Sequence, residues 1–119
     1  MSALAIPIAN YSDDYVVTFS NVEVNLDRAT VRRDGANVEL TSSEFALLSC
    51  FLHNPERTLT RDWLLGSVWT NLRDPNTRTV DTHIMRLRRK LEANPARPRH
   101  FVTMHRSGYR FSPAGLGTE

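Results

Sequence analysis

The sequence contains one cysteine, Cys50, and no long uninterrupted run of hydrophobic residues. A single thiol excludes an internal disulfide and suits a reducing compartment, where a lone cysteine is usually a small apolar filler. No stretch approaches the roughly 18 apolar residues that a membrane span requires. Residues 1–14 also lack the basic start and apolar stretch of a signal peptide. These absences predict a cytoplasmic protein that has no membrane partner.

The usual marks of an enzyme are missing as well. The sequence has no glycine-rich phosphate loop, no nucleophile elbow and no acid and base pair in a plausible cleft. Its four histidines show no metal-ligand spacing with Cys50 or with a carboxylate. We therefore expect neither catalysis nor a cofactor or metal, and the 119 residues leave room for one domain with short tails.

Charge is present but unevenly distributed. The formal net charge is only +2, yet residues 78–110 hold nine Arg or Lys against two acidic residues, which makes that segment +7. Residues 1–77 hold ten acidic residues against six basic ones. A basic segment in a nearly neutral chain favours one surface that faces a polyanion, although a solvated charged face without a partner would look the same.

The first half of the chain has the pattern of a small sheet. Residues 16–19 form one short hydrophobic run, hydrophobic residues alternate with polar ones over 22–26, and two further short runs start at Thr30 and Val38. Asp34-Gly35 between the last two runs is a tight-turn signal, because Gly tolerates positive φ. Four short strands with short links predict an antiparallel sheet.

Two core helices are expected next. Thr41 and Glu44 form a capping box, and the helix that follows should end near His53. After a short extended link, Thr60 can cap a second helix that runs through Trp69. Residues 70–77 are predicted to form a loop.

The third predicted helix, about 78–92, has two distinct faces. One narrow stripe is apolar and should dock on the core: Val80, Ile84, Leu87 and Leu91. The opposite side carries Arg78, Thr82, Met85 and Arg89, flanked by Thr79 and Arg86. Such a face suits the major groove of DNA, where Arg pairs with the guanine edge. Residues 101–111 then predict a terminal β-hairpin that suits the DNA backbone or an adjacent minor groove.

Several motifs occur in order along the chain: Leu40-Thr41 with Glu44-Phe45, Arg61 with Val68-Trp69, Arg78 to Ile84, Leu87 to Leu91, and Gly108 to Phe111. Together they resemble the effector domain of the OmpR/PhoB family of response regulators. The resemblance implies an α+β winged helix-turn-helix with an N-terminal four-stranded antiparallel sheet, three helices and a C-terminal β-hairpin wing. It spans residues 15–112, with residues 1–14 as a tail or linker remnant and 113–119 as a flexible tail.

The resemblance also implies roles for single residues in sequence-specific binding of double-stranded DNA and transcription regulation. Phosphate contacts are expected from Arg78, His83 and Arg88, and base contacts from Arg86 with Thr82 and Asp81. Thr103 would contact backbone or sugar. The complete predicted DNA-binding set is Arg78, Thr79, Asp81, Thr82, His83, Met85, Arg86, Arg88, Arg89, Thr103, His105 and Arg106. Tyr109 and Phe111 would belong to the core, and Trp69 would pack under the loop.

The partners that the resemblance implies extend beyond DNA. The loop residues Asn71, Leu72, Arg73 and Asp74 would contact RNA polymerase. Such domains usually bind direct repeats as head-to-tail homodimers, under the control of a receiver domain that a histidine kinase phosphorylates. A receiver of about 120 residues does not fit into residues 1–14, so the chain is either a fragment or a free-standing regulator. The linker-like composition of residues 10–14 favours a fragment.

Two positions depart from the family pattern. In the wing, His105 stands where the family has an arginine, and Arg106 replaces a glycine. On the third helix, Met85 occupies a position that is commonly basic, so one phosphate contact is lost or a thymine methyl is met instead. The altered wing leaves an alternative function open: a winged-helix protein-interaction module that does not read DNA.

Overall fold

The computed structural model describes residues 15–115, so the predicted tail 1–14 and the last four residues of the predicted tail 113–119 lie outside the described residues. Three helices and two sheets make up this part of the chain. The helices are α1 (Ser42–Leu52), α2 (Arg61–Val68) and α3 (Thr77–Leu91). The strands are β1 (Val16–Phe19), β2 (Val22–Asn25), β3 (Thr30–Arg33), β4 (Ala36–Asn37), β5 (Thr58–Leu59), β6 (Phe101–Met104) and β7 (Gly108–Phe111). The predicted fold class is confirmed.

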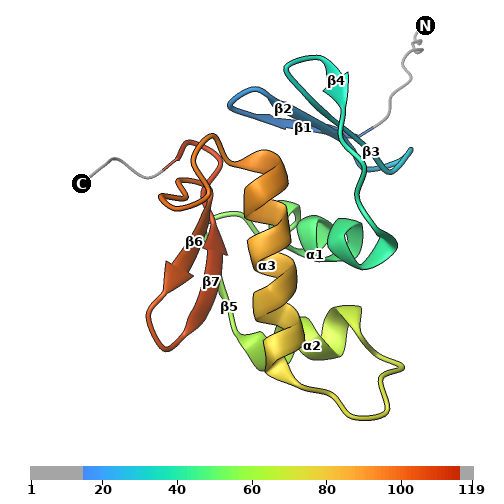
Figure 1. Ribbon diagram of the computed structural model, residues 1–119, viewed down its shortest axis with the longest axis vertical. Helices are drawn as coiled ribbons and strands as arrows, with labels where there is room; N and C mark the ends of the chain where they lie inside the picture. Colours follow the sequence, from blue (N-terminus) through green and yellow to red (C-terminus); the bar gives the residue numbers. More distant parts are fainter. Residues whose placement is uncertain (1–14, 116–119) are drawn as a thin grey trace, which may run out of the picture.

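The longest helix, α3, organises the other elements (Figure 1). The four-stranded antiparallel sheet, in the order β1-β2-β3-β4, lies near the C-terminal end of α3, and α2 lies near its N-terminal end. The hairpin of β6 and β7 runs alongside α3. Both α1 and α2 pack against α3. The helix therefore has a buried side, a wing side and a side left open to solvent.

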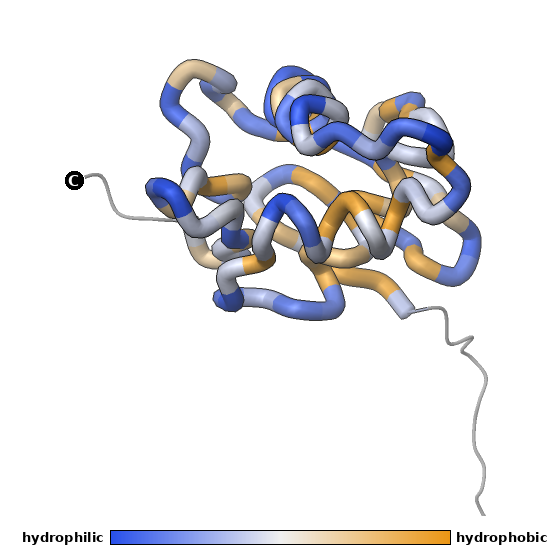
Figure 2. The backbone as a smooth tube through the Cα atoms, turned by 90° about the horizontal axis from the view of Figure 1, so that it is seen from below, coloured by the Kyte–Doolittle hydropathy of each residue, from blue (hydrophilic) through white to orange (hydrophobic). Residues whose placement is uncertain are grey.

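The core is formed by hydrophobic residues from all of these elements. On α3 the predicted stripe is buried: Val80, Ile84, Leu87 and Leu91. Phe19 from β1 makes edge-to-face contacts with Phe101 and Phe111 of the hairpin, at centroid distances of 5.9 and 5.0 Å. The N-terminal sheet and the hairpin thus share one core. Figure 2, which looks roughly along α3, shows hydrophobic and hydrophilic stretches alternating along the chain, as expected where each element buries one face.

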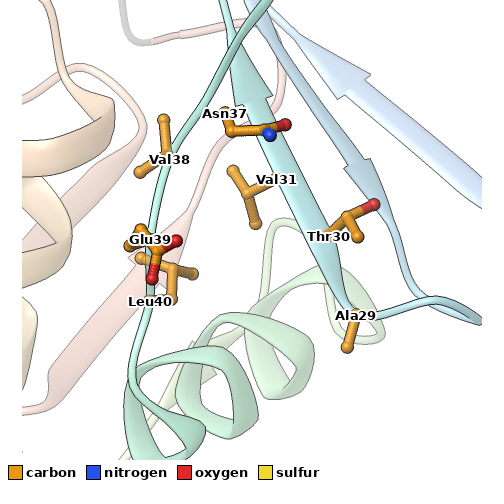
Figure 3. Close-up of a pocket in the computed structure, with 7 residues that line it drawn as sticks. All are labelled: Ala29, Thr30, Val31, Asn37, Val38, Glu39 and Leu40. Atoms are coloured by element: carbon orange, nitrogen blue, oxygen red, sulfur yellow. The ribbon is translucent and has the colours of Figure 1, made fainter.

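The N-terminal sheet forms as predicted, except in its last strand. Asp34 and Gly35 both have positive φ, 53° and 79°, and form the predicted tight turn between β3 and β4. The prediction of a strand over Val38 and Leu40 is wrong: β4 ends at Asn37, and only one further hydrogen bond follows, from the Val38 amide to the Val31 carbonyl at 2.9 Å. Figure 3 shows the two segments separating around an open pocket. Beyond Val38 the chain bonds to α3, where the carbonyl of Glu39 accepts from Lys90 Nζ at 2.7 Å.

Helix α1 begins with the predicted capping box. The Thr41 hydroxyl accepts from the Glu44 amide, and a Glu44 carboxylate oxygen accepts from the Thr41 amide. The same Oε1 atom accepts from Lys90 Nζ at 2.7 Å, although Glu44 is only 1% exposed. Burial alone would raise the pKa of Glu44, but the hydrogen bonds from Lys90 and Thr41 and the charges of Lys90 and Arg86 outweigh it and lower that pKa. One carboxylate therefore caps α1 and joins it to the end of α3.

The wing is a three-stranded sheet, in the order β5-β7-β6, and not an isolated hairpin. The predicted link at Thr58–Leu59 is strand β5, which pairs with Arg110 and Tyr109 of β7. This pairing requires glycine at position 108, where φ is 137° and an added Cβ would lie 2.1 Å from the carbonyl oxygen of Leu59. The predicted tail begins as a turn, closed by the Gly115 amide on the Ser112 carbonyl.

Replacing Gly108 with Ala should destabilise the protein by at least about 2 kcal/mol, because the new Cβ overlaps backbone and occupies a positive-φ position. Chemical denaturation with urea measures the change. Gly66→Ala is the matched control, since a Cβ at Gly66 meets nothing within 4 Å and Ala in a helix interior stabilises by about 0.5–1 kcal/mol. Equal effects of the two substitutions would contradict this account.

Replacing Glu44 with Gln should cost about 1–3 kcal/mol near neutral pH, because a charge-assisted hydrogen bond to Lys90 is weakened. The pKa of Glu44 is lowered by folding, so its contribution is complete above the ordinary value of 4.5 and is lost as the pH falls through the folded pKa. The stability difference between wild type and E44Q should therefore narrow below about pH 4.5.

Urea denaturation at several pH values tests this, with Glu39→Gln as the control, because the Glu39 side chain is exposed. A difference between wild type and E44Q that stays constant with pH would contradict the proposed ion pair.

Candidate nucleic-acid interface

Helix α3 presents an exposed polar face opposite its buried stripe. Its N-cap is Asn76, whose side chain accepts from the Arg78 amide at 2.8 Å. The exposed residues are Arg78, Thr82, Met85, Arg86 and Arg89. Within residues 15–115 the side chains of these three arginines and of Thr82 form no hydrogen bond or ion pair. Three guanidinium groups and a hydroxyl on one helix face are thus available to an external partner.

The wing side of α3 is held by Arg88. Its Nε donates to the carbonyl of Phe101 at 2.9 Å, and its terminal nitrogen donates to the Thr103 hydroxyl at 2.8 Å. Burial lowers the pKa of Arg88, while the Tyr109 and Glu92 charges oppose that shift. Arg88 and Thr103 were both predicted to contact the DNA backbone. In the structure their side chains are hydrogen-bonded to each other.

Asp81 lies at the junction of α2, α3 and β7. Its Oδ1 atom accepts from Arg61 Nε of α2 at 2.7 Å and from the Tyr109 hydroxyl of β7 at 2.6 Å. Asp81 was predicted to face bases. In the structure its carboxylate joins α2, α3 and β7. Position 61 was part of the family resemblance, but its pairing with Asp81, twenty residues away, has no local signal in the sequence.

The ring of Tyr109 is contacted by two guanidinium groups. Arg61 lies 5.2 Å and Arg88 5.6 Å from the ring centroid, which is cation–π distance. Burial raises the pKa of Tyr109, and its hydrogen bond to Asp81 raises it further. The hydrogen bond to Asp81 raises the pKa of Arg61 as well. Tyr109 is buried as predicted, and its hydroxyl serves as a donor within the fold.

The base of the wing is tied to the end of α3 by Glu92. Its carboxylate accepts from the amides of Arg99, His100 and Phe101, at 3.0, 2.9 and 2.7 Å. Glu92 is only 2% exposed. This role also escaped the sequence analysis, because the three amides lie beyond a loop. The first wing strand thus starts at a fixed place relative to α3.

The turn of the wing contains one residue, Arg106, in a left-handed backbone conformation. Arg106, at the position where the family resemblance implied glycine, adopts a φ of 65°. The Ser107 amide closes the turn on the Met104 carbonyl at 2.8 Å. Both His105 and Arg106 are exposed at the tip. The turn therefore forms without the glycine, at the cost of a left-handed conformation in a residue with a side chain.

The rings of His83 on α3 and Trp69 at the end of α2 pack against each other. Their rings lie 4.8 Å apart in an edge-on arrangement, and His83 Nδ1 donates to the carbonyl of Thr79 at 2.8 Å. A phosphate contact through Nε2 would then require the doubly protonated, cationic ring. The loop residues 71–74, predicted to contact RNA polymerase, are all exposed. Trp69 packs against the core at the start of this loop.

A helix held outward by two others, with a three-stranded wing beside it, defines a winged helix-turn-helix. Residues 35–111 match the family model described as "Transcriptional regulatory protein, C terminal", and the chain belongs to that family. This is a family of transcriptional regulatory domains and not a class of enzymes.

The relatives of the chain agree with this assignment. The KDP operon transcriptional regulatory protein KdpE of Escherichia coli is 40% identical over 103 residues, which cover 87% of this chain and 46% of KdpE. The chain therefore spans less than half the length of this relative.

Among residues 15–115, none of the helices has the length and hydropathy that a membrane span requires.

Two solved structures show the same fold. The response regulator DrrB of Thermotoga maritima, an OmpR/PhoB homologue, superposes with a TM-score of 0.74 at 33% identity, over 82% of this chain and 44% of DrrB. The DNA-binding domain of RstA from Klebsiella pneumoniae, solved in complex with the RstA box, gives 0.72 at 30% identity, over 82% of this chain and 97% of that one.

Replacing Tyr109 with Phe should destabilise the protein by about 1–3 kcal/mol, because a hydrogen bond to a carboxylate is lost. Urea denaturation measures this, with Tyr15→Phe as the control, since Tyr15 is 51% exposed. In a double-mutant cycle with Asp81→Asn, the two effects should be less than additive. Full additivity would show that Tyr109 and Asp81 do not interact.

Proposed function

We propose that this chain is a sequence-specific binding domain for double-stranded DNA and the effector part of an OmpR/PhoB-type response regulator. In this proposal α3 occupies the major groove, and the β6–β7 hairpin of the wing lies on the backbone and an adjacent minor groove. The observation that supports it most strongly is the exposed face of α3, where the side chains of Arg78, Arg86 and Arg89 form no hydrogen bond or ion pair within residues 15–115. The complex of the related RstA domain with its DNA box also supports it.

The predicted contacts divide into two groups on this basis. Arg86, with Thr82, is assigned to base edges, where a guanidinium can pair with the two acceptors of guanine. Eight of the other predicted residues are assigned to phosphates, sugars and the minor groove: Arg78, Thr79, His83, Arg88, Arg89, Thr103, His105 and Arg106. Asp81 is assigned a positioning role for α3. The segment 78–110, which contains these residues, has a formal charge of +7, as suits a polyanionic partner.

Further partners are proposed from the same family relationship. They are a second copy bound head to tail on a direct repeat, RNA polymerase at the exposed loop 71–74, a receiver domain and its cognate histidine kinase. The relatives are about twice as long as this chain, which agrees with a receiver in the parent protein. A cytoplasmic location follows from this function.

A protein-interaction module that does not read DNA is the second candidate, and the unusual wing residues His105 and Arg106 favour it. Salt distinguishes the two functions. Binding to DNA should weaken by orders of magnitude between about 50 and 200 mM salt, because counterions are released from phosphates. Selection from a random duplex pool at about 150 mM salt should enrich one sequence if DNA is the partner. A lack of any enrichment would reject the proposed function.

Replacing Arg86 with Ala should weaken binding to the selected site by about 1–3 kcal/mol and relax the preference at one base pair, because a bidentate base contact is lost. Fluorescence anisotropy on the selected duplex and on single-base variants measures both effects. Equal losses on all sequences would remove Arg86 from the base-reading residues.

His83→Ala is the matched control for the Arg86 experiment, since it tests a phosphate contact on the same helix. It should weaken binding to all sequences alike and reduce the salt slope by about one. A change in base preference in H83A would show that these assignments are wrong.

A further inference from the structure

Met85 is the one exposed large hydrophobic side chain on α3 among residues 15–115. It is 51% exposed, and the other exposed large hydrophobic residues lie on β1 or just before it, on α2 or in the loop before α3. Met85 lies on the same exposed face as the guanidinium groups of Arg78, Arg86 and Arg89. An unbranched apolar side chain in that place contributes nothing to the core, so its surface is available to be covered by a partner.

The position of Met85 around the helix follows from its neighbours. It is four residues after Asp81 and three before Arg88, so these three side chains are adjacent on the helix surface. Asp81 and Arg88 both bond to the wing, through Tyr109 and Thr103. Met85 therefore lies on the wing side of the exposed face.

Arg86 lies about 100° further around the helix. It lowers the pKa of Glu44 through its charge, and Lys90, four residues on, bonds directly to Glu44 of α1. The exposed face thus has an apolar position on the wing side and a cationic position on the α1 side. A helix with its side chains is about 10–12 Å wide, so the two positions reach base pairs within about three steps of each other.

We infer that Met85 is a specificity-determining residue that contacts the C5-methyl group of a thymine, on the wing side of the base that Arg86 reads. The inference rests on the proposed function. Within the major groove the thymine methyl is the distinctive apolar group, while the other base-edge groups are donors and acceptors. A thioether placed on those groups would leave them without a hydrogen bond. Contact with a methyl group is therefore the favourable arrangement.

The test compares thymine with deoxyuridine, which lacks only the C5-methyl group. The duplex selected by the wild-type chain is prepared with each thymine replaced in turn, and Kd is measured by fluorescence anisotropy. Binding of the wild type should weaken about fourfold at one position, between the base that Arg86 reads and the wing, since one buried methyl group contributes about that much.

The variants separate this contact from a general loss of affinity. Met85→Ala should bind the thymine duplex about fourfold more weakly and should no longer distinguish thymine from deoxyuridine. Met85→Leu should retain the discrimination, because it keeps an apolar side chain. Val16→Ala is the matched control, since Val16 is 42% exposed but lies on β1 of the N-terminal sheet. It should discriminate as the wild type does.

The outcomes also separate this inference from the proposed function. If a site is enriched and R86A relaxes it, but no thymine shows a methyl effect in the wild type, the role of Met85 is rejected and DNA reading stands. Discrimination that persists unchanged in M85A rejects it equally. If no duplex is enriched, both the proposed function and the role of Met85 are rejected.

Discussion

The arrangement of the proposed interface depends on one carboxylate oxygen, Asp81 Oδ1. It accepts from Arg61 and from Tyr109, so α2, α3 and β7 meet at a single atom. The rotation of α3 decides which of its side chains face outward, and this junction opposes any rotation. Arg88 and Glu92 add further bonds between α3 and the first wing strand. Helix α3 and the wing are thereby joined as one unit, which in the proposed function meets two grooves at a fixed separation.

The cations of the basic segment serve two purposes. Arg88 and Lys90 are bonded within the fold, to the wing strand and to the capping carboxylate of α1. Arg78, Arg86 and Arg89 remain exposed on α3. A charge count over residues 78–110 therefore overstates the surface that is free to meet DNA. The internal cations still matter for binding, because they determine where the exposed ones are held.

How well each feature could be predicted depends on whether its cause is local. The capping box of α1 and the stripe of α3 rest on residues within one or two turns, and both were predicted correctly. Strand β5 forms by pairing with β7, which is distant in sequence, and the carbonyl of Glu39 just after β4 bonds to Lys90 of α3. The exposed arginines of α3 followed from periodicity. The hydrogen bonds of Asp81 and Thr103 did not follow from periodicity, because their partners are distant in sequence.

The two faces of α3 also bear on how such domains diversify. The buried stripe and the bonded flank carry the stability of the helix, whereas Thr82, Met85, Arg86 and Arg89 are exposed. Substitutions at exposed positions away from such features usually change stability by less than about 0.5 kcal/mol. Duplicated copies of this domain can therefore acquire new target sequences one substitution at a time, while each intermediate stays folded. The amphipathic pattern of α3 thus places the residues that maintain the fold and the residues proposed to determine DNA specificity on different faces of one helix.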